Sequence, residues 1–599
     1  MTMRSRTRRL LVPIATTAVA LALAAAPATA GPAPRAGGQA GATDPAAAAL
    51  ADMTTDQKIG QLFETYVYGT SATDVTASEA ATNQRLYGVD TGAEVVAKYH
   101  LGAVIYFSWT DNLQDPIQIA TLSNGLQQAA SDAGDPPLLI STDQEGGNVT
   151  RIGAPLAVSP GNMALGATFS PGDSYDMSHA TGQQLAALGI NVDDAPVADV
   201  NTNPQNSADG PRSFGDRAGH VAAMVRASVT GYQDAGIAAT VKHFPGLGST
   251  AINTDNGVAV SDETIQQIRR NDLPPFRQAI AAGVDEIMAA HIVMPALDPS
   301  GAPASVSAPI VTGLLRHTLH YNGVVVTDAL SAAALEGIPA DQRALRAFEA
   351  GDDLLLMPEN LGASIDAIRQ ALQSGEITMA RLDESVLRIL RLKQKLGLFD
   401  NAMVDASTVL SRVGTDQQDA IAARAARDSI TLVRNDDGTL PLTPDSGASV
   451  LVTGWGVGTT STLTADIASH GVTVDRMWTG SPSQATIDAV VAAAKTHDYV
   501  VVTTDNAWGD ASQQSLVNQL LATGTPVIAV AVAAPYGLAY FPSAPTFLAG
   551  YGYQADTLAA VADVLFGAQP LGHLPVTIRS ADGSGVVAHY ATGMRYPVG

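Results

Sequence analysis

The chain contains no cysteine among its 599 residues. Disulfide bonds, thiolate metal sites, a thiol nucleophile and a lipidated N-terminal cysteine are therefore excluded. Basic residues are also scarce: 33 Lys and Arg stand against 57 Asp and Glu, a formal net charge of −24. This charge repels nucleic acids and anionic membrane surfaces, so neither is expected as a partner. No group of candidate ligands has convincing metal-site spacing, and we expect neither a metal nor another cofactor.

Long apolar runs are absent except near the start of the chain. Four arginines between residues 4 and 9 precede an apolar run over 10–26, and Ala28-Thr29-Ala30 offers a small-residue cleavage site. This order predicts a signal peptide over 1–30, so we expect a secreted protein. The run is short for a membrane anchor. The segment Thr7-Arg8-Arg9 partly resembles a twin-arginine signal, which leaves the export route open. Residues 31–45 are rich in Gly, Ala and Pro and predict a flexible linker.

Short apolar runs ending in polar residues alternate with amphipathic stretches between residues 46 and 400. Stretches such as 115–133 and 264–282 carry apolar residues at helical spacing. Alternating strands and helices indicate parallel βα units, and eight units predict a (β/α)8 TIM barrel over 46–400. The predicted strands are 59–66, 102–107, 137–143, 192–200, 239–243, 286–291, 323–328 and 353–357.

A second region of alternating pattern follows the predicted barrel. Residues 401–446 are interpreted as a linker and interdomain segment, and 447–599 predict a smaller α/β sandwich domain. Its predicted strands are 449–453, 498–503, 525–532 and 546–549. The glycine-rich segment 454–458 follows a strand, as a phosphate-binding turn would. Its spacing is not that of the dinucleotide fingerprint, so we expect a structural turn.

Several predicted barrel strands end in polar or charged residues. These ends are Asp143-Gln144-Glu145, Asp199-Val200-Asn201, His291, Asp328 and Lys242-His243, the last where a Pro-Gly loop begins. Burying such groups is costly unless a ligand or partner satisfies them. The carboxyl ends of barrel strands meet on one face, where catalytic groups of such barrels cluster. The sequence therefore predicts a site at this face.

Long motifs along the chain carry a resemblance to a known family. In chain order they are STDQEGGNVTRI (141–152), DVNTNP (199–204), RSFG (212–215), KHFPGLG (242–248), AAHIVMPALD (289–298), GVVVTDAL (323–330), RDSITLVRNDDGTLPL (427–442) and GTPVIAVAVAAPYGLAYFP (524–542). These motifs resemble the two-domain family 3 glycoside hydrolases, and most closely their β-N-acetylglucosaminidase (β-N-acetylhexosaminidase) branch. The resemblance covers nearly all of 46–580.

The resemblance implies retaining glycoside hydrolysis with Asp328 as the nucleophile. In this chemistry one carboxylate attacks the anomeric carbon, while a second group protonates the leaving oxygen and later activates water. An Asp at the end of the apolar run Val324-Val325-Val326 would be held rigidly at the barrel mouth. The alternative is that Asp328 caps the next helix.

The resemblance also implies a set of substrate-binding residues. Asp143, Arg212, Lys242 and His243 match positions that hold the hydroxyls and ring of the terminal sugar, and His291 supports this group. Lys242 and Arg212 would also favour an ionised nucleophile. For the two histidines, a hydrogen-bonded core imidazole is the alternative interpretation.

The general acid/base departs from the family pattern. N-acetylglucosaminidases of this family usually carry an Asp-x-His dyad, with the His thirteen residues beyond the Lys. Counted from Lys242, these two positions are Asn253 and Asp255, and Leu247 replaces the His that follows Pro-Gly. No histidine lies between residues 244 and 290.

Asp255 is therefore the predicted general acid/base, carried on a mobile loop. The last glutamate of the chain is Glu384, so the second domain offers none, and Asp505 and Asp510 rank below Asp255. The charge of Asp328 and desolvation would raise the pKa of Asp255. A carboxylate there repels phosphate, which favours hydrolysis over phosphorolysis. The alternative is a purely structural Asx turn.

The predicted function is a secreted retaining exo-β-glycosidase. We expect a β-N-acetylhexosaminidase that releases terminal N-acetylglucosamine from peptidoglycan or chitin fragments. Ala332 stands where similar sequences often have Met, which leaves the acetamido preference open. The alternatives are a β-glucosidase or β-xylosidase of the same family, a sugar-binding homologue with impaired catalysis and, more remotely, a phosphate-binding barrel enzyme. The oligomeric state and the role of the second domain stay open.

Overall fold

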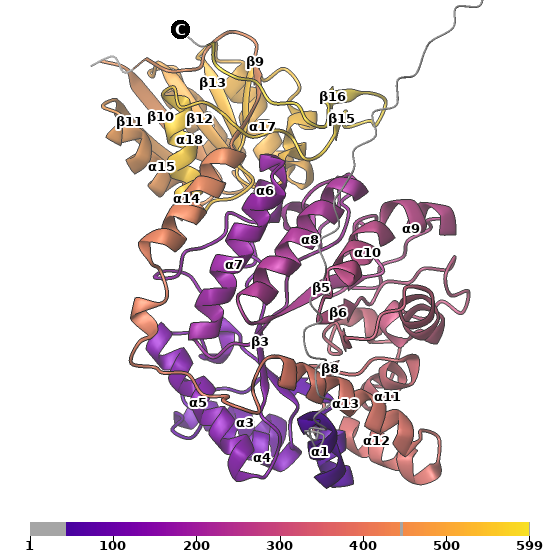
Figure 1. Cartoon of the computed structure of the whole chain (residues 1–599). Coiled ribbons are helices and arrows are strands. Elements are labelled where there is room, and N and C mark those ends of the chain that lie inside the picture. Colours follow the sequence, from indigo (N-terminus) through magenta and orange to yellow (C-terminus); the bar gives the residue numbers. More distant parts are fainter. Residues whose placement is uncertain (1–43, 444–446, 598–599) are drawn as a thin grey trace, which may run out of the picture. The chain divides into compact units, whose positions relative to one another are not determined.

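Eight short parallel strands form the centre of the larger domain (Figure 1). The computed structural model describes residues 44–443 and 447–597, so the predicted signal peptide and nearly all of the predicted linker lie outside the described residues. Along the sheet the strand order is β7-β6-β5-β4-β3-β2-β1-β8. The strands are β1 Phe63–Thr65, β2 Ala103–Ile105, β3 Leu139–Thr142, β4 Val192–Asp193, β5 Ala238–Phe244, β6 Glu286–Ala289, β7 Val324–Thr327 and β8 Leu355–Leu356.

A parallel bridge between Val326 and Leu354 joins the two edges of this sheet, which makes it a nearly closed barrel. The predicted TIM-barrel fold is confirmed. The first strand was predicted to begin at Ile59, which is wrong, because Ile59 lies in helix α2 (Thr55–Gly60). Thr54 and Gln57 form a capping box that starts this helix.

Helices follow the barrel strands and surround them in Figure 1. They are α1 Pro45–Asp52, α2, α3 Ala77–Tyr87, α4 Gly92–Tyr99, α5 Pro116–Asp132, α6 Asn162–Thr168, α7 Pro171–Ala187, α8 Ala218–Asp234, α9 Ile265–Asn271, α10 Leu273–Ala281, α11 Ala340–Ala350, α12 Leu361–Ser374 and α13 Met379–Lys395. Short 3-10 turns are η1 Ser108–Thr110, η2 Gly210–Arg212, η3 Ala304–Val306, η5 Ala333–Leu335 and η6 Val409–Ser411, and η4 Pro309–Thr318 is a π-helix. None of the described helices is both long and apolar enough to cross a membrane.

The second domain is built on a six-stranded sheet of order β11-β10-β12-β13-β14-β9. Its strands are β9 Thr431–Asn435, β10 Ser449–Gly454, β11 Thr473–Trp478, β12 Tyr499–Thr504, β13 Val527–Ala531 and β14 Thr546–Ala549, and β15 Ile578–Arg579 pairs with β16 Val586–Ala588. Its helices are α14 Asp416–Ser429, α15 Val457–Ser469, α16 Gln484–Ala494, α17 Ala511–Leu521 and α18 Ala555–Leu565, with 3-10 turns η7 Ala507–Gly509 and η8 Pro535–Tyr540.

Two strands of this sheet were not predicted. Strand β9 lies inside 401–446, the segment interpreted as a linker, and pairs antiparallel with β14 at one edge. The second sheet therefore begins before residue 447. Strand β11 forms the other edge, and most of its side chains are exposed, so it lacks the apolar run that marks a buried strand.

The barrel and the second domain belong to one compact unit that begins at Asp44. Met163, Ala164 and Ala167 of the barrel helix α6 lie in the same buried apolar cluster as second-domain residues such as Phe547. The His573 N–H donates to the Ala167 carbonyl oxygen at 2.9 Å, and Gln554 Nε2 donates to the Gly147 carbonyl oxygen at 2.6 Å. The interface therefore combines apolar burial with hydrogen bonds to the barrel backbone.

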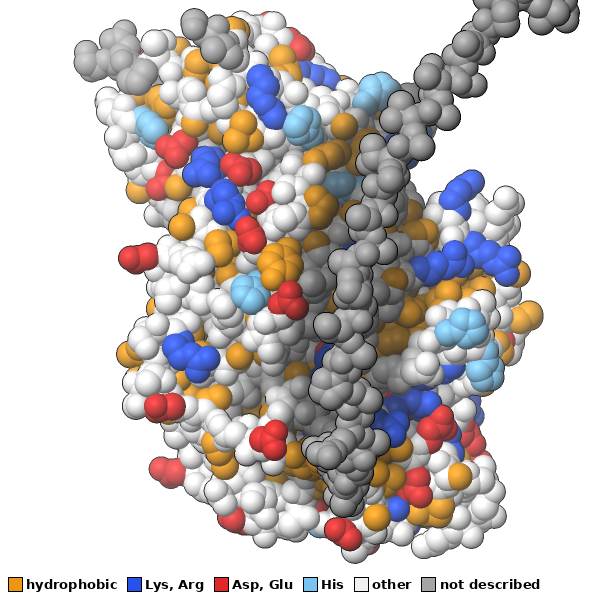
Figure 2. All heavy atoms as spheres, in the orientation of Figure 1, with side chains coloured by type: hydrophobic (Ala, Val, Ile, Leu, Met, Phe, Trp, Pro, Cys, Tyr) orange, Lys and Arg blue, Asp and Glu red, His pale blue; other side chains and the backbone are white. Residues whose placement is uncertain are grey.

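Acidic and basic side chains are interspersed on the face shown in Figure 2. The net charge of −24 is therefore not gathered into a single acidic patch on this face.

Candidate active site

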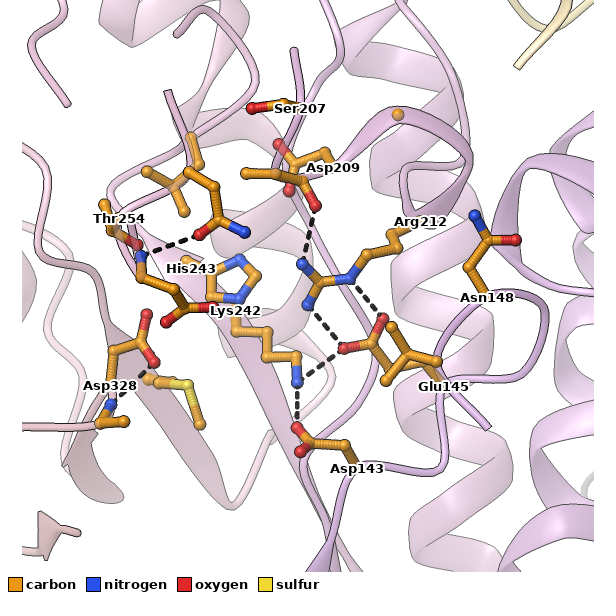
Figure 3. Close-up of a pocket in the computed structure, with 18 of the residues that line it drawn as sticks. Asp143, Glu145, Asn148, Ser207, Asp209, Arg212, Lys242, His243, Thr254 and Asp328 are labelled. Atoms are coloured by element: carbon orange, nitrogen blue, oxygen red, sulfur yellow. Dashed lines mark hydrogen bonds and ion pairs between the residues drawn. The ribbon is translucent and has the colours of Figure 1, made fainter. Parts of the chain in front are cut away.

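A cavity of about 550 Å³ opens at the carboxyl ends of the barrel strands (Figure 3). Residues that follow β3, β5 and β7 line it, together with residues 253–255 of the loop after β5 and Asn506 and Trp508 of the second domain. Six of the predicted site residues line this cavity: Asp143, Arg212, Lys242, His243, Asp255 and Asp328. The structure thus brings these six side chains together from strand β5 and from the segments that follow β3, β4, β5 and β7, while His291 lies outside the cavity lining.

Lys242 and Arg212 meet at one carboxylate (Figure 3). Arg212 donates two hydrogen bonds to Glu145, at 2.8 and 2.7 Å, and Lys242 Nζ lies 2.8 Å from Glu145 Oε1. Lys242 Nζ also donates to Asp143 Oδ1 at 2.7 Å, and Arg151 contacts the other oxygen of Asp143 at 3.0 Å. This network holds Arg212 in a bidentate pair with Glu145 and places Lys242 between the carboxylates of Asp143 and Glu145.

The network decides the charge of its members. Burial alone would raise the pKa of Glu145, but Arg212 and Lys242 lower it to about 2. Burial likewise opposes ionisation of Asp143, yet Lys242 and Arg151 hold its pKa below the usual range. Burial favours neutral Lys242, whereas Asp143 and Glu145 raise its pKa. All of these groups are therefore charged at neutral pH.

Glu145 is the functional residue that the sequence analysis did not assign. It lies in the polar segment that follows β3, two residues beyond Asp143, so its place at the barrel mouth was visible. Its partnership with Arg212, 67 residues away, was not visible from local pattern. A carboxylate at a strand end near two predicted cations is the signal that points to it.

The buried carboxylate of Asp199 orients His243. Its Nδ1 lies 2.7 Å from Asp199 Oδ2, and the Leu247 N–H donates to Asp199 Oδ1 at 2.6 Å. Burial disfavours the charged imidazole, but Asp199 raises the pKa of His243. Burial and the charge of Asp199 raise the pKa of Asp209 to about 8. Asp209 therefore keeps a proton at neutral pH.

Asp199, Asp209 and His243 also form the only cluster of three candidate metal ligands found among the described residues, with ligand atoms within 4.8 Å of one another. Asp199 already accepts hydrogen bonds from the His243 ring and from backbone N–H groups. Burial and the charge of Asp199 keep a proton on Asp209, so Asp209 offers a cation no charged oxygen. The donor set does not present the free, charged oxygens that a hard cation requires.

Asp328 follows β7 directly and lines the cavity. Its Oδ1 accepts a hydrogen bond from the Ala329 N–H at 2.8 Å, and its own N–H donates to the Ala289 carbonyl oxygen at 2.9 Å. Burial alone would raise the pKa of Asp328, but the nearby His291 and His243 hold it below the usual value. The next helical turn, η5, begins at Ala333 with Ala332 at its cap, so Asp328 does not cap a helix.

His291, predicted to support the substrate-binding residues, does not line the cavity. Its Nδ1 lies 2.7 Å from Ser305 Oγ, and its Nε2 donates to the Ala329 carbonyl oxygen at 2.9 Å. Both ring nitrogens are engaged with protein atoms in a fully buried site. His291 therefore holds the backbone beside Asp328, as a hydrogen-bonded core imidazole does.

Asp255 lies on the loop after β5, whose residues 253–255 line the cavity. Its N–H donates to Asn253 Oδ1 at 2.9 Å, so the expected Asx turn is present. The turn leaves the Asp255 side chain free to reach the cavity, which it lines together with Asp328. Although this side chain is exposed, partial burial raises its pKa, and the charge of Asp328 raises it further.

The two second-domain carboxylates have other surroundings. Asp510 caps helix α17 by accepting hydrogen bonds from Ser512 and Gln513. Burial raises the pKa of Asp505 to about 6, and its backbone N–H is held by the Gln513 side chain. Neither residue lines the cavity, whereas their neighbours Asn506 and Trp508 do.

Comparison with known proteins identifies the class that this fold and site define. Residues 54–392 match the glycosyl hydrolase family 3 N-terminal domain, and residues 430–599 match the family 3 C-terminal domain. The chain belongs to glycosyl hydrolase family 3 and is a glycoside hydrolase that acts on O-glycosyl bonds.

Within this family the chain resembles β-hexosaminidases. Beta-hexosaminidase A of Pseudoalteromonas piscicida is 36% identical over 430 residues, which cover 66% of this chain and 70% of that protein. A beta-N-acetylglucosaminidase/beta-glucosidase of Cellulomonas fimi is 33% identical over 413 residues, covering 67% of this chain and 68% of that protein. The structure of a family 3 beta-N-acetylglucosaminidase from Paenibacillus sp. str. FPU-7 superposes with a TM-score of 0.80 at 36% identity, covering 88% of this chain and 99% of that chain.

Proposed function

We propose that the protein is an exported, retaining exo-β-glycosidase that releases terminal N-acetylglucosamine from chitin or peptidoglycan fragments. The observation that carries this proposal is the placement of Asp328, an ionised carboxylate at a strand end, in the same cavity as the Asp143–Lys242–Glu145–Arg212 network. The relatives named as β-hexosaminidases support the choice of sugar.

In the proposed mechanism, an Asp328 oxygen attacks the anomeric carbon as the bond from that carbon to the leaving oxygen breaks. Asp255 transfers its proton to the leaving oxygen, which departs as an alcohol. The Asp255 carboxylate then takes a proton from a water molecule. The oxygen of this water attacks the anomeric carbon, and the bond between that carbon and the Asp328 oxygen breaks. Lys242, Arg212 and Asp143 orient the sugar hydroxyls through charged hydrogen bonds.

The role of the nucleophile is tested with Asp328→Ala. We expect kcat to fall at least about 10³-fold on a nitrophenyl N-acetylglucosaminide, because Asp143 and Glu145 of the same cavity are held in ion pairs with Lys242 and Arg212. Incubation of the wild type with a 2-fluoro sugar fluoride should add one sugar mass to the peptide that contains Asp328. Undiminished turnover by the variant, or labelling elsewhere, contradicts the assignment.

The role of the acid/base is tested with Asp255→Asn on two substrates. A poor leaving group needs the proton, so its turnover should fall about 10² to 10⁴-fold, whereas a nitrophenyl substrate should lose far less in glycosylation. If the variant keeps wild-type turnover on the poor leaving group, Asp255 is not the general acid/base. Asp262→Asn, an exposed carboxylate on the same segment outside the cavity, is the matched control.

A second candidate is activity on β-glucosides. The Cellulomonas fimi relative carries both activities in its name. Ala332, where similar sequences often have Met, is buried and is not among the residues that line the cavity. Side-by-side kcat/KM values on nitrophenyl N-acetylglucosaminide and nitrophenyl glucoside decide between the two specificities.

The export proposal rests on the arginine-rich start and the apolar run over residues 10–26. Expression of the full chain in its host should place the protein outside the cytoplasm with its new N-terminus near residue 31. Retention of residues 1–30 in the mature protein would contradict this.

A further inference from the structure

A second large hollow lies in the outer, helical layer of the barrel. Helix α8 lies between α7 and α10 there (Figure 1), and residues of these three helices line a groove of about 720 Å³, which we call the α7–α8–α10 groove. None of its lining residues lines the active-site cavity, whose volume is about 550 Å³. The groove is therefore separate from the site described above and larger than it.

Small side chains of α8 form the floor of this groove. They are Gly219, Ala222, Ala223, Ala227 and Thr230. Successive spacings of three and four residues place them on one face of the helix, over a length of about 16 Å. The distance between two packed helices depends on the side chains at their contact, so a row of small residues lets another helix approach closely.

The lining of the groove contains two arginines and no carboxylate. Arg226 of α8 and Arg277 of α10 are both exposed, and Arg226 Nη1 donates to Gln278 Oε1 of α10 at 3.3 Å. Neither arginine forms an ion pair with any other residue that the structure describes, unlike the basic partners of the acids on these helices. A planar guanidinium matches a carboxylate in a bidentate manner. The two side chains therefore offer donors for an anionic ligand.

The carboxylates around the groove have other surroundings. Those on α7, α8, α10 and the residues that lead into them are Asp173, Asp176, Asp216, Asp234 and Asp272. Arg424 contacts Asp173 and Asp176 at 3.5 and 2.5 Å, which leaves one negative charge on α7. Arg217 contacts Asp216 at 3.3 Å.

The two remaining acids differ in charge. Burial and the nearby Glu263 raise the pKa of Asp272 to about 9, so Asp272 is neutral at pH 7. Asp234, at the end of α8, accepts a hydrogen bond from Tyr175 Oη at 3.1 Å and places a negative charge at one end of the groove. The lining itself is therefore positive in a chain whose formal charge is −24, and a local field of this sign attracts anionic ligands.

This chain does not itself supply a complementary segment. Residues 1–43, which lie outside the described residues, contain arginines but no Asp or Glu, so their charge has the wrong sign for the groove. Among the described residues, no α-helix exposes more than one large apolar side chain, so a second copy offers no helix with an exposed apolar face. The charge and the apolar floor together therefore point to another protein.

We propose that the α7–α8–α10 groove binds an acidic amphipathic helix of a partner protein. The apolar face of this helix packs on the small-residue row of α8, and its carboxylates pair with Arg226 and Arg277. Helix-in-groove binding uses apolar side chains at helical spacing, and the 16 Å floor accommodates about three turns. An anionic polysaccharide would use the arginines but leave the alanine methyl groups of the floor without an apolar partner. The interaction is additional to the proposed glycosidase reaction and does not depend on it.

The test measures fluorescence anisotropy of three labelled synthetic peptides with the full protein. The acidic peptide carries Leu at helical spacing on one face and Glu on both sides of that face. In the second peptide Lys replaces every Glu, and the third has the composition of the first in scrambled order. We expect the acidic peptide to bind at least about tenfold more tightly than the other two, because only it matches both the floor and the charge. Its affinity should fall as the salt concentration rises, since both arginines are exposed.

Two variants separate the charge from the floor. Arg226→Gln/Arg277→Gln should weaken binding of the acidic peptide about tenfold, as expected for the loss of two exposed ion pairs. Ala223→Phe, at an exposed position, fills the floor without changing the charge and should weaken binding by at least as much. Arg346→Gln/Arg476→Gln, exposed arginines on α11 and β11, is the charge-matched control. Urea unfolding checks that each variant keeps the stability of the wild type.

Equal affinity for the three peptides, no binding of the acidic peptide, or the same loss in the control variant would each overturn the proposal. Unchanged affinity after Arg226→Gln/Arg277→Gln would overturn it as well. An oligogalacturonate, which is a carboxylated glycan without an apolar helix face, is measured in parallel. If it binds more tightly than the acidic peptide and depends on the same arginines, the groove is a site for anionic glycans and the helix proposal is wrong.

Discussion

Among the individual residues, Glu145 pairs with both buried cations of the site, Arg212 and Lys242. Its side chain is 1% exposed and holds both Arg212 and Lys242. Removing one partner from a buried ion network leaves uncompensated charge, which costs more than the pair contributes when intact.

We therefore expect Glu145→Gln to lower the free energy of unfolding by about 3 kcal/mol and kcat/KM by at least about tenfold. Because the pKa of Glu145 is depressed in the folded protein, its stabilisation is present above about pH 4.5 and is lost as the pH falls toward 2. Urea unfolding at pH 7 and pH 3 measures both effects, with the exposed Glu376→Gln as control. A variant as stable as this control at pH 7 would contradict the role.

The sequence indicates roles for residues whose position alone is informative, but not for residues whose role depends on a distant partner. Asp328 and Lys242 were visible because each ends an apolar strand. Glu145 and Asp199 depend on partners that the fold supplies, Arg212 and His243. For His291 the strand-end pattern pointed to the cavity, but the Ser305 and Ala329 contacts that occupy its ring were not visible in the sequence.

At the scale of strands and loops, the barrel interior contains acids that the catalytic cavity does not use. Glu64 on β1 and Glu286 on β6 are buried, and Ser141 Oγ on β3 donates to Glu64. Burial and the nearby Asp194 raise the pKa of Glu64 to about 8. The folded protein thus binds a proton that the unfolded chain releases above about pH 4.5.

This linkage predicts that stability decreases as the pH rises from about 4.5 to 8, by at most roughly 1.4 kcal/mol per pH unit for this group. Glu64→Gln removes the titration while keeping the shape and the oxygen that accepts from Ser141. The free energy of unfolding of the variant minus that of wild type, measured in urea, should be larger at pH 8 than at pH 5. An identical difference between the two proteins at both pH values would show that Glu64 is not protonated in the fold.

Strand prediction succeeded where the strand is buried on both faces and failed at the edges. Strands β10, β12 and β13 are apolar runs in the middle of the second sheet. Strand β11 is solvent-exposed, and β9 is a lone antiparallel strand within a segment that has no other strand pattern. Such edge strands are defined by pairing with a neighbour, which local sequence does not encode.

At the scale of the whole molecule, the second domain packs against the barrel and contributes residues to the active-site cavity. Asn506 and Trp508 line the active-site cavity, and α6 of the barrel lies in the apolar cluster of the second domain. The boundary between the domains in sequence is therefore not a boundary in the core.

Deletion of residues 430–599 should leave the apolar face of α6 exposed to water. We expect the remaining chain to be aggregation-prone and to unfold at lower urea concentration than the full protein, because large exposed apolar patches destabilise soluble domains. Size-exclusion chromatography and urea unfolding measure this. A monomeric fragment that retains full activity on the nitrophenyl substrate would show that the barrel is independent.

Helix α6 has a further consequence for domain movement and for protein engineering. Helix α6 packs in the apolar cluster of the second domain and is hydrogen-bonded to it, so moving the two domains apart would expose this buried face. A chimaera that exchanges the C-terminal domain should also exchange residues 162–168, because the side chains of α6 pack against this particular second domain and would not fit another one.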